Sequence, residues 1–157
     1  IPAIKPNGWL SSDQVLNDFG CDGGNRSPRL GWRNPPAGTK SFALTVYDPD
    51  APTGSGWWHW VVINIPSSIY MLPESAGNMS LRLLPSEAIQ VPTDFGRSGF
   101  GGACPPAGDK PHKYIFTVYA LNTEKIVLPK YATAAFAGFM INAHLIDKVS
   151  VTAIYGR

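Results

Sequence analysis

An alternation of apolar and polar residues predicts a β-strand over residues 40–47. Successive side chains of a strand point to opposite faces, so Phe42, Leu44 and Val46 share one face. Asp48 follows in phase with this apolar row. The pattern therefore places a carboxylate at the end of an otherwise apolar face.

A second strand is predicted directly after Gly56, and here the polar residue comes first. Strict alternation puts His59 in one row with Val61, Ile63 and Ile65. If the two strands pair antiparallel, the end of the first lies beside the start of the second. The carboxylate and the imidazole are then expected at the same end of the sheet, as a polar site in an apolar floor.

Residues 112–121 are expected to form the clearest strand, because aromatic and β-branched residues dominate them. Tyr114, Phe116 and Val118 share one face. His112 begins that face, so a polar residue again marks the end of an apolar row.

A helix is predicted late in the chain, with Thr133 as its cap and its end around Val149. Its apolar stripe follows the spacing i, i+3, i+4, i+7 and consists of Phe136, Phe139, Met140 and Ala143. A last strand is expected over residues 150–155, and short strands within residues 27–32 and 67–90. These elements predict a mainly β fold: one domain over residues 1–157, built as a sandwich of antiparallel sheets with the late helix packed at its edge.

Composition narrows the classes of protein that fit this fold. The chain has 157 residues, 44% of them hydrophobic and 15% charged, as in a globular domain. Its 13 basic and 11 acidic residues give a net charge of +2, and no basic cluster points to nucleic acid. The absence of an apolar run of about 18 residues argues against a membrane span. Because the chain begins at Ile1, we expect that a leader peptide was removed or that the chain was trimmed.

The two cysteines, Cys21 and Cys104, lie far apart and lack the spacing of a zinc site. They form either one disulfide or two buried thiols. We favour the disulfide, because both residues lie in loops rich in glycine and proline, where a core thiol is less expected.

Three polar residues, Asp48, His59 and His112, each stand at a strand end beside a loop rich in glycine or proline. A single one of them is typical of a hydrogen-bonded residue that braces a loop. All three together indicate a binding site. Histidine N–H groups, together with a nest formed by the backbone N–H groups of Gly101 and Gly102, suit a phosphate or a carboxylate.

Catalysis is the alternative interpretation of the same residues. Two histidines and a carboxylate can hold a metal, or act as acid and base on a hydrolysable substrate. The chain contains no GxSxG, HExxH or P-loop motif. We therefore predict a protein that is not an enzyme and needs no metal or cofactor.

The WWHW run offers two further alternatives. Trp58 and Trp60 are expected to pack under the second sheet or in a homodimer contact. Stacking of an exposed tryptophan on a sugar is a less favoured hypothesis.

Three segments of the chain resemble a known family. The run DPDAP at residues 48–52, the WxH at residues 57–59 and GGACPPAGDKPHKY at residues 101–114 resemble the signature segments of the phosphatidylethanolamine-binding proteins, also called Raf kinase inhibitor proteins. The chain is most similar to the bacterial YbhB/YbcL branch. The resemblance implies a β-sandwich with a small pocket for phospholipid head groups or phosphorylated ligands. It also raises the alternative of a protease or kinase-pathway inhibitor that binds a protein partner through the pocket loops.

The resemblance also implies roles for individual residues. The residues that match the pocket lining of the family are Asp48, Trp57, His59, Pro106 and His112. Asp50 matches an aspartate that supports the pocket loop. Cys104 departs from the glycine of many members and suits a tether to Cys21. Paired cysteines resemble those of periplasmic members, so a periplasmic or secreted protein is expected, with the cytoplasm as the alternative.

Overall fold

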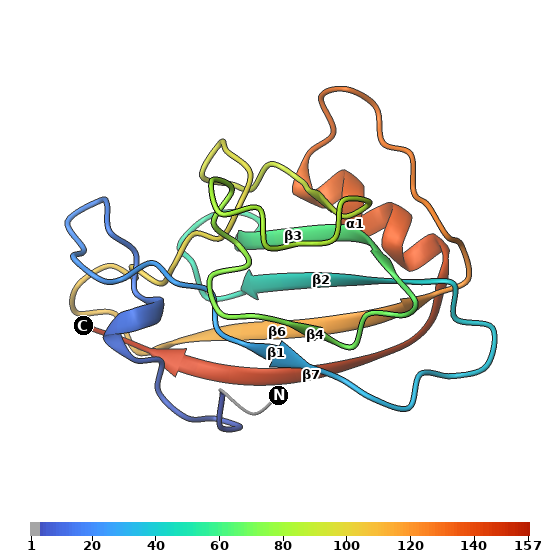
Figure 1. The fold of residues 1–157 in the computed structure, drawn as a ribbon. Helices are drawn as coiled ribbons and strands as arrows, with labels where there is room; N and C mark the ends of the chain where they lie inside the picture. The colour runs from blue at the N-terminus through green and yellow to red at the C-terminus, as the bar shows by residue number, and fades with distance from the viewer. Residues whose placement is uncertain (1–3) are drawn as a thin grey trace.

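A computed structural model describes residues 4–157 of the chain as two antiparallel sheets and one α-helix (Figure 1). The large sheet has the order β5-β3-β2-β6-β7 and the small sheet pairs β1 with β4. The strands are β1 (Leu30–Gly31), β2 (Ser41–Asp48), β3 (Trp57–Pro66), β4 (Met71–Leu72), β5 (Ile89–Gln90), β6 (His112–Leu121) and β7 (Leu145–Tyr155). The helices are the 3-10 helix η1 (Ser12–Gln14) and α1 (Ala134–Ala143). The predicted mainly β fold with antiparallel sheets and a late helix is confirmed.

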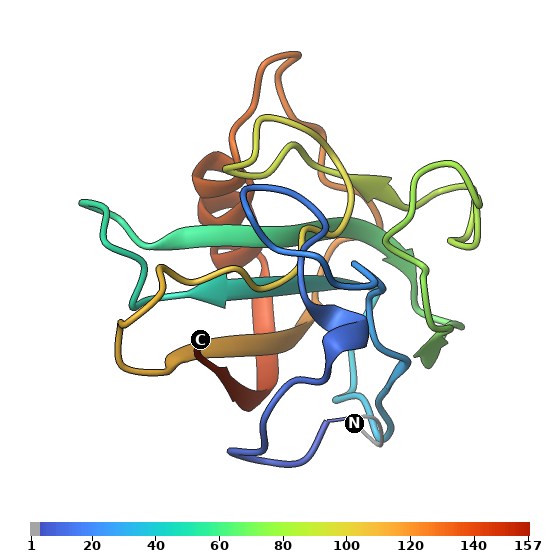
Figure 2. The same cartoon turned by 90° about the vertical axis from the view of Figure 1, so that its left-hand side faces the viewer.

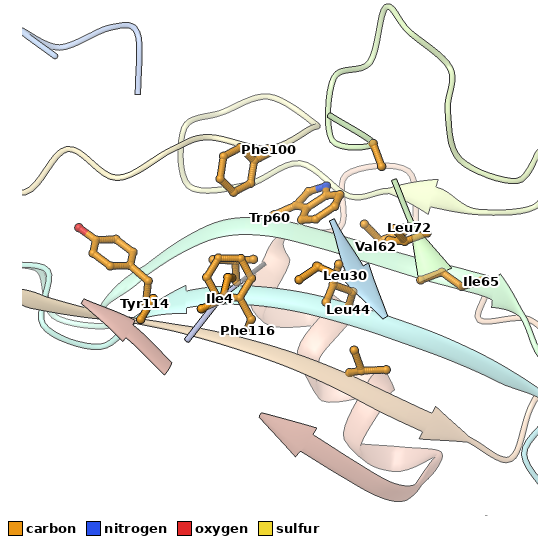
Figure 3. Packing of buried hydrophobic residues seen from close by; sticks show 14 of the residues in the cluster. Ile4, Leu30, Leu44, Trp60, Val62, Ile65, Leu72, Phe100, Tyr114 and Phe116 are labelled. Atoms are coloured by element: carbon orange, nitrogen blue, oxygen red, sulfur yellow. The ribbon is translucent and has the colours of Figure 1, made fainter. Parts of the chain in front are cut away.

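The main core lies between one face of the large sheet and the small sheet with its adjoining loops (Figure 3). Its large side chains come from β2, β3 and β6 on one side and from β1 and β4 on the other. The predicted rows of β2 and β6 both belong to it, because Phe42, Leu44, Val46, Tyr114, Phe116 and Val118 are all buried there. Trp60 is fully buried in this core and donates its indole N–H to Gln90 Oε1 (2.7 Å). Packing of Trp60 under the second sheet is thus confirmed.

Strand β3 does not follow the strict alternation expected of it. Val46 pairs with Trp60 and Tyr47 pairs with Trp58, so His59 is an extra residue in a β-bulge. After the bulge, Val61 and Ile63 face the helix side of the sheet. The prediction that His59 shares a row with them is therefore wrong. A bulge changes which face each later residue occupies, and the apolar pattern of a strand buried on both sides does not reveal it.

Helix α1 covers the second face of the large sheet and packs with a different stripe from the one predicted. Thr133 caps the helix, since its side chain accepts a hydrogen bond from the Phe136 backbone N–H (3.1 Å). The buried residues of the helix are Ala134, Ala137 and Ile141. Phe139 is 73% exposed, so the predicted aromatic stripe is wrong. Small alanines let the helix axis approach the sheet, which large phenylalanines at the contact would prevent.

The chain leaves the helix earlier than predicted. The helix ends at Ala143 with His144 as its C-cap, and β7 already begins at Leu145 instead of residue 150. Pairing along β6 accounts for this difference, because β7 forms ladder partners with all ten residues of that strand. The outer edge of β7 is covered in turn by the N-terminal segment, where Trp9 forms a parallel bridge to Ile154.

Candidate functional site

The end of β2 and the starts of β3 and β6 meet at one end of the large sheet, which faces the viewer in Figure 2. Asp48 is the ladder partner of Trp57, so their side chains point to the same face. The loops over residues 17–25, 49–56, 92–106 and 106–111 gather around this end (Figure 2). As predicted, Asp48 and His59 come from the same end of the sheet.

A cavity of about 290 Å³ opens between these strand ends and loops. Asp48, His59 and His112 all line it, and each is at most 5% exposed. The other lining residues are Leu16, Phe19, Ala51, Pro52, Thr53, Trp57, Phe95, Cys104, Pro105, Pro106 and Tyr114. The cavity therefore combines a few buried polar groups with largely apolar and aromatic walls, as small-ligand sites do.

His112 is held between two carboxylates. Its Nδ1 donates to Asp48 Oδ2 (2.7 Å) and its Nε2 donates to Asp109 Oδ2 (2.9 Å). Burial lowers the pKa of His112, but the hydrogen bonds and charges of Asp48 and Asp109 outweigh burial and raise it above 6.5. The imidazolium form is therefore favoured, and both of its N–H groups are used within the protein.

Replacing Asp109 with asparagine is expected to lower the pKa of His112, because one of the two carboxylates that stabilise the imidazolium is lost. A pH titration of the histidine ring resonances by NMR measures this change. Asp147→Asn is the matched control, since Asp147 pairs in register with Ala120 at the far end of β6. An unchanged pKa of His112 in the Asp109 variant would contradict the role assigned to this contact.

His59 has the opposite electrostatic state. Its Nδ1 must carry a proton, because it lies 2.8 Å from the Gly101 carbonyl oxygen, which can only accept. Burial lowers the pKa of His59 below 6.5, and the Gly101 carbonyl and the Asp48 charge offset this only in part. His59 is thus favoured as a neutral imidazole. Within residues 4–157, no group forms a hydrogen bond with its Nε2.

The predicted anion nest at Gly101 and Gly102 is wrong. The Gly101 N–H donates to the His59 carbonyl oxygen (2.9 Å) and the Gly102 N–H donates to Asn25 Oδ1 (2.7 Å). Gly102, a candidate ligand contact from the sequence, does not line the cavity. A Cβ on Gly101 would lie 2.2 Å from the Phe95 ring, and one on Gly102 2.3 Å from the Gln14 carbonyl oxygen. Close packing explains both glycines.

Two hydrogen-bond donors of the cavity wall have no partner within the described part of the chain. They are the indole N–H of Trp57 and the hydroxyl of Tyr114, and both atoms are buried. Figure 3 shows the Tyr114 hydroxyl pointing away from the other labelled core side chains. Burial and the charge of Asp48 raise the pKa of Tyr114, so its hydroxyl keeps its proton. An unpaired buried donor costs about 1–3 kcal/mol, which a ligand acceptor would recover.

The aromatic walls come largely from loops. The Phe95 ring stands edge-on to the rings of Trp57 and His59 (centroids 5.4 Å apart in both pairs) and stacks with Phe19 at 6.0 Å. Trp58, the neighbour of Trp57, points to the other face and contacts Tyr47 (ring centroids 4.4 Å apart). One tryptophan of the pair thus faces the cavity, as strand geometry requires.

Several links fix the loops around the cavity. Asp50 accepts hydrogen bonds from the Lys113 backbone N–H (2.8 Å) and Nζ (2.9 Å). The structure contains a disulfide between Cys21 and Cys104, which joins the loop beside Phe19 to the loop that follows Gly102. Arg157 Nε donates to the Pro105 carbonyl oxygen (2.7 Å). The cavity walls are thus held by covalent and polar contacts.

The geometry offers little for metal binding or acid–base chemistry. Both nitrogens of His112 are engaged by carboxylates, which leaves no lone pair for a metal. Over residues 4–157, no three His, Cys, Asp or Glu side chains converge as metal ligands would. The site is therefore suited to binding through hydrogen bonds and apolar contact.

Sequence reasoning did not assign Phe19, Phe95 and Asp109 to the site. The two phenylalanines reach the cavity from loops without regular periodicity, so no pattern in the sequence identifies them. Asp109 offered a weak signal, because it lies three residues before His112.

Fold and site together define a small-ligand-binding β-protein, with one enclosed polar cluster at a sheet end. The profile described as "Phosphatidylethanolamine-binding protein" matches residues 2–156. This chain belongs to that family.

Individual relatives agree with this assignment. The chain is 54% identical to UPF0098 protein YbcL of Escherichia coli (strain K12) over 97% of its own length and 83% of that protein. It is 50% identical to UPF0098 protein YbhB of the same organism, over 97% and 95% of the two chains. The crystal structure of E. coli YbcL superposes with a TM-score of 0.96 at 53% identity and covers 99% of this chain and 94% of that one. In residues 4–157, no helix is long and apolar enough to cross a membrane.

Proposed function

We propose that this protein is a non-catalytic binding protein whose cavity receives the phosphate group of a small phosphorylated ligand or a phospholipid head group. The observation that carries the proposal is the pair of unpaired buried donors, Trp57 Nε1 and the Tyr114 hydroxyl, in the wall of a cavity lined by Asp48, His59 and His112. Phosphate oxygens are strong acceptors and match such donors. The family membership supports a binding role.

The apolar walls bear on the shape of the ligand. Phe95, Pro52 and Pro106 surround the polar cluster, so a ligand must bury some apolar surface besides its phosphate. A cavity of about 290 Å³ suits a head group or a small ester and leaves no room for an acyl chain. The disulfide supports an oxidising, extracytoplasmic compartment as the place where this ligand is met.

An NMR titration of the histidine side chains tests the proposal. Phosphate, phosphoethanolamine and a neutral sugar are added in turn. Saturable shifts are expected at His59 and His112 with the two phosphates only. His144, which is hydrogen-bonded to Asn122 at the opposite end of β6, is the internal control. No shift at millimolar phosphate would contradict the proposal and direct attention to protein partners of the pocket loops.

Tyr114→Phe is expected to weaken phosphoethanolamine binding about tenfold or more, since a hydrogen bond to a charged group is worth about 1.5–3 kcal/mol. The same change should leave the free protein equally stable or slightly more stable, because the hydroxyl has no partner in the described structure. Calorimetric binding and denaturant unfolding measure the two effects. Tyr119→Phe is the matched control: its hydroxyl bonds Thr45 on the helix side of the sheet, so stability should fall while affinity stays unchanged.

A further inference from the structure

The cavity exposes hydrogen-bond acceptors as well as donors. His59 is 5% exposed, and its Nδ1–H is committed to the Gly101 carbonyl. A neutral imidazole with a proton on Nδ1 has a lone pair on Nε2, so this atom accepts and cannot donate. Nε2 is absent from the buried unpaired atoms of the described residues, which indicates that it reaches the open space of the cavity.

A second acceptor lies beside it. Asp48 is 3% exposed, and its two oxygens accept from the Asp50 backbone N–H (2.7 Å) and from His112 Nδ1 (2.7 Å). Each carboxylate oxygen can accept more than one hydrogen bond. Because His112 is flanked by Asp48 and Asp109, these three ionised groups carry a net charge of −1.

A fully deprotonated oxyanion fits these groups poorly. Its oxygens would face the His59 lone pair and the Asp48 carboxylate, and no proton would lie between the acceptors. Two acceptors left facing each other in a buried site cost free energy and bring charge repulsion. A phosphate that retains one O–H group removes the conflict, because that hydroxyl donates to the ring nitrogen and the other oxygens accept from Tyr114 and Trp57.

We propose that the cavity accepts a phosphate group in its protonated form, with the P–OH donating to His59 Nε2, and therefore selects phosphate monoesters over phosphodiesters and sulfate. The inference rests on the proposed function and adds the chemical class of its ligand. A phosphodiester has no P–OH at any pH near neutrality, and sulfate likewise has no proton to donate.

Methyl phosphate and dimethyl phosphate form the matched probe pair, because they differ by one methyl group on a phosphate oxygen. Calorimetric titration of the whole protein is expected to show methyl phosphate binding at least tenfold more tightly than dimethyl phosphate or sulfate at about pH 5. The second pKa of a phosphate monoester is about 6, so methyl phosphate affinity should fall about tenfold per pH unit above it. Titrations at about pH 7.5, in buffers of different ionisation enthalpy, should then show uptake of about one proton per ligand bound.

Other titrating groups face the same space and are controlled by the probe pair. They are Asp48 on β2, Asp94 in the loop after β5, and His112 and Tyr114 on β6. Their titration affects both esters, whereas the ligand proton belongs to methyl phosphate alone. The difference between the two pH profiles therefore isolates the proposed P–OH contact.

A soluble lipid pair distinguishes a lipid head group from a free ester. Dihexanoyl phosphatidic acid carries a monoester and dihexanoyl phosphatidylethanolamine a diester, and the first is expected to bind more tightly. Tighter binding of this acid than of methyl phosphate would identify the lipid as the source of the ligand. The reverse order within the lipid pair would overturn the inference.

The outcomes separate the two proposals. Equal affinity for the two methyl esters, with no proton uptake, overturns the selectivity and leaves the phosphate site intact. No binding of any ester at millimolar concentration overturns both. One measurement needs no ligand: the nitrogen resonance of His59 Nε2 at neutral pH should be that of an unprotonated ring nitrogen, and a protonated one would refute the acceptor role.

Discussion

Asp48→Asn is expected to destabilise the protein by about 3–5 kcal/mol near pH 6, because it removes one partner of a buried ion pair. The asparagine keeps the shape of the side chain but leaves the His112 imidazolium with Asp109 as its only carboxylate partner. Denaturant unfolding of both proteins measures the loss.

The pH dependence of this loss has a definite sign. The pKa of His112 is raised above 6.5 in the folded protein, because its carboxylate partners outweigh burial. The stability from this group is therefore fully present below about pH 6.5 and is lost as pH rises through the raised pKa. The difference between wild type and Asp48→Asn should accordingly be largest at pH 6.5 and below, and smaller at about pH 9.

Asp147→Asn is the control for this comparison, and as an exposed substitution it should change stability by about 0.5 kcal/mol at most. A loss in Asp48→Asn that is the same at every pH would show that the effect comes from packing and not from the ionised pair.

The double variant Cys21→Ser, Cys104→Ser is expected to lose about 4 kcal/mol of stability. The disulfide closes a loop with a sequence separation of 83 residues, and the chain-entropy relation gives about this value for such a loop. For a chain of this length the loss corresponds to a fall in Tm of roughly 10 °C. Thermal unfolding with and without dithiothreitol measures it.

Ligand affinity should fall in the same double variant. Cys104 lines the cavity, and Cys21 holds the segment that carries Phe19 against Phe95 at its mouth. Without the crosslink this wall must be ordered when the ligand binds, which costs binding free energy. Reductant should lower the Tm of wild type to that of the variant and leave the variant unchanged. A wild-type Tm that is insensitive to complete reduction would contradict the prediction.

The helix shows why a sequence pattern can predict an element and miss its buried face. The cap at Thr133 is a local property, and it was predicted correctly. Phe136 and Phe139 are more hydrophobic than the alanines, so periodicity alone selects them as the buried stripe. The buried face was instead decided by how closely α1 approaches the sheet, and that distance is tertiary information.

Strand β3 shows the same limit for the site. Alternation correctly predicted a strand with a histidine near its start, but the bulge at His59 depends on pairing with β2. Without the bulge, the rest of β3 would turn its apolar residues to the wrong faces. The electrostatic states also depend on partners distant in sequence, such as Gly101 for His59 and Asp48 for His112.

The sequence by itself determined the strands, the class of fold, and the gathering of Asp48, His59 and His112 at one end of a sheet, because alternation and antiparallel pairing are local rules. Only the tertiary structure decided which groups of the cavity donate and which accept. It committed the glycine N–H groups to internal bonds, enclosed His112 between two carboxylates, and left two donors and one imidazole nitrogen without partners among the described residues. Hydrogen-bond partnership and burial arise only when distant segments come together, so they cannot be predicted from the order of residues.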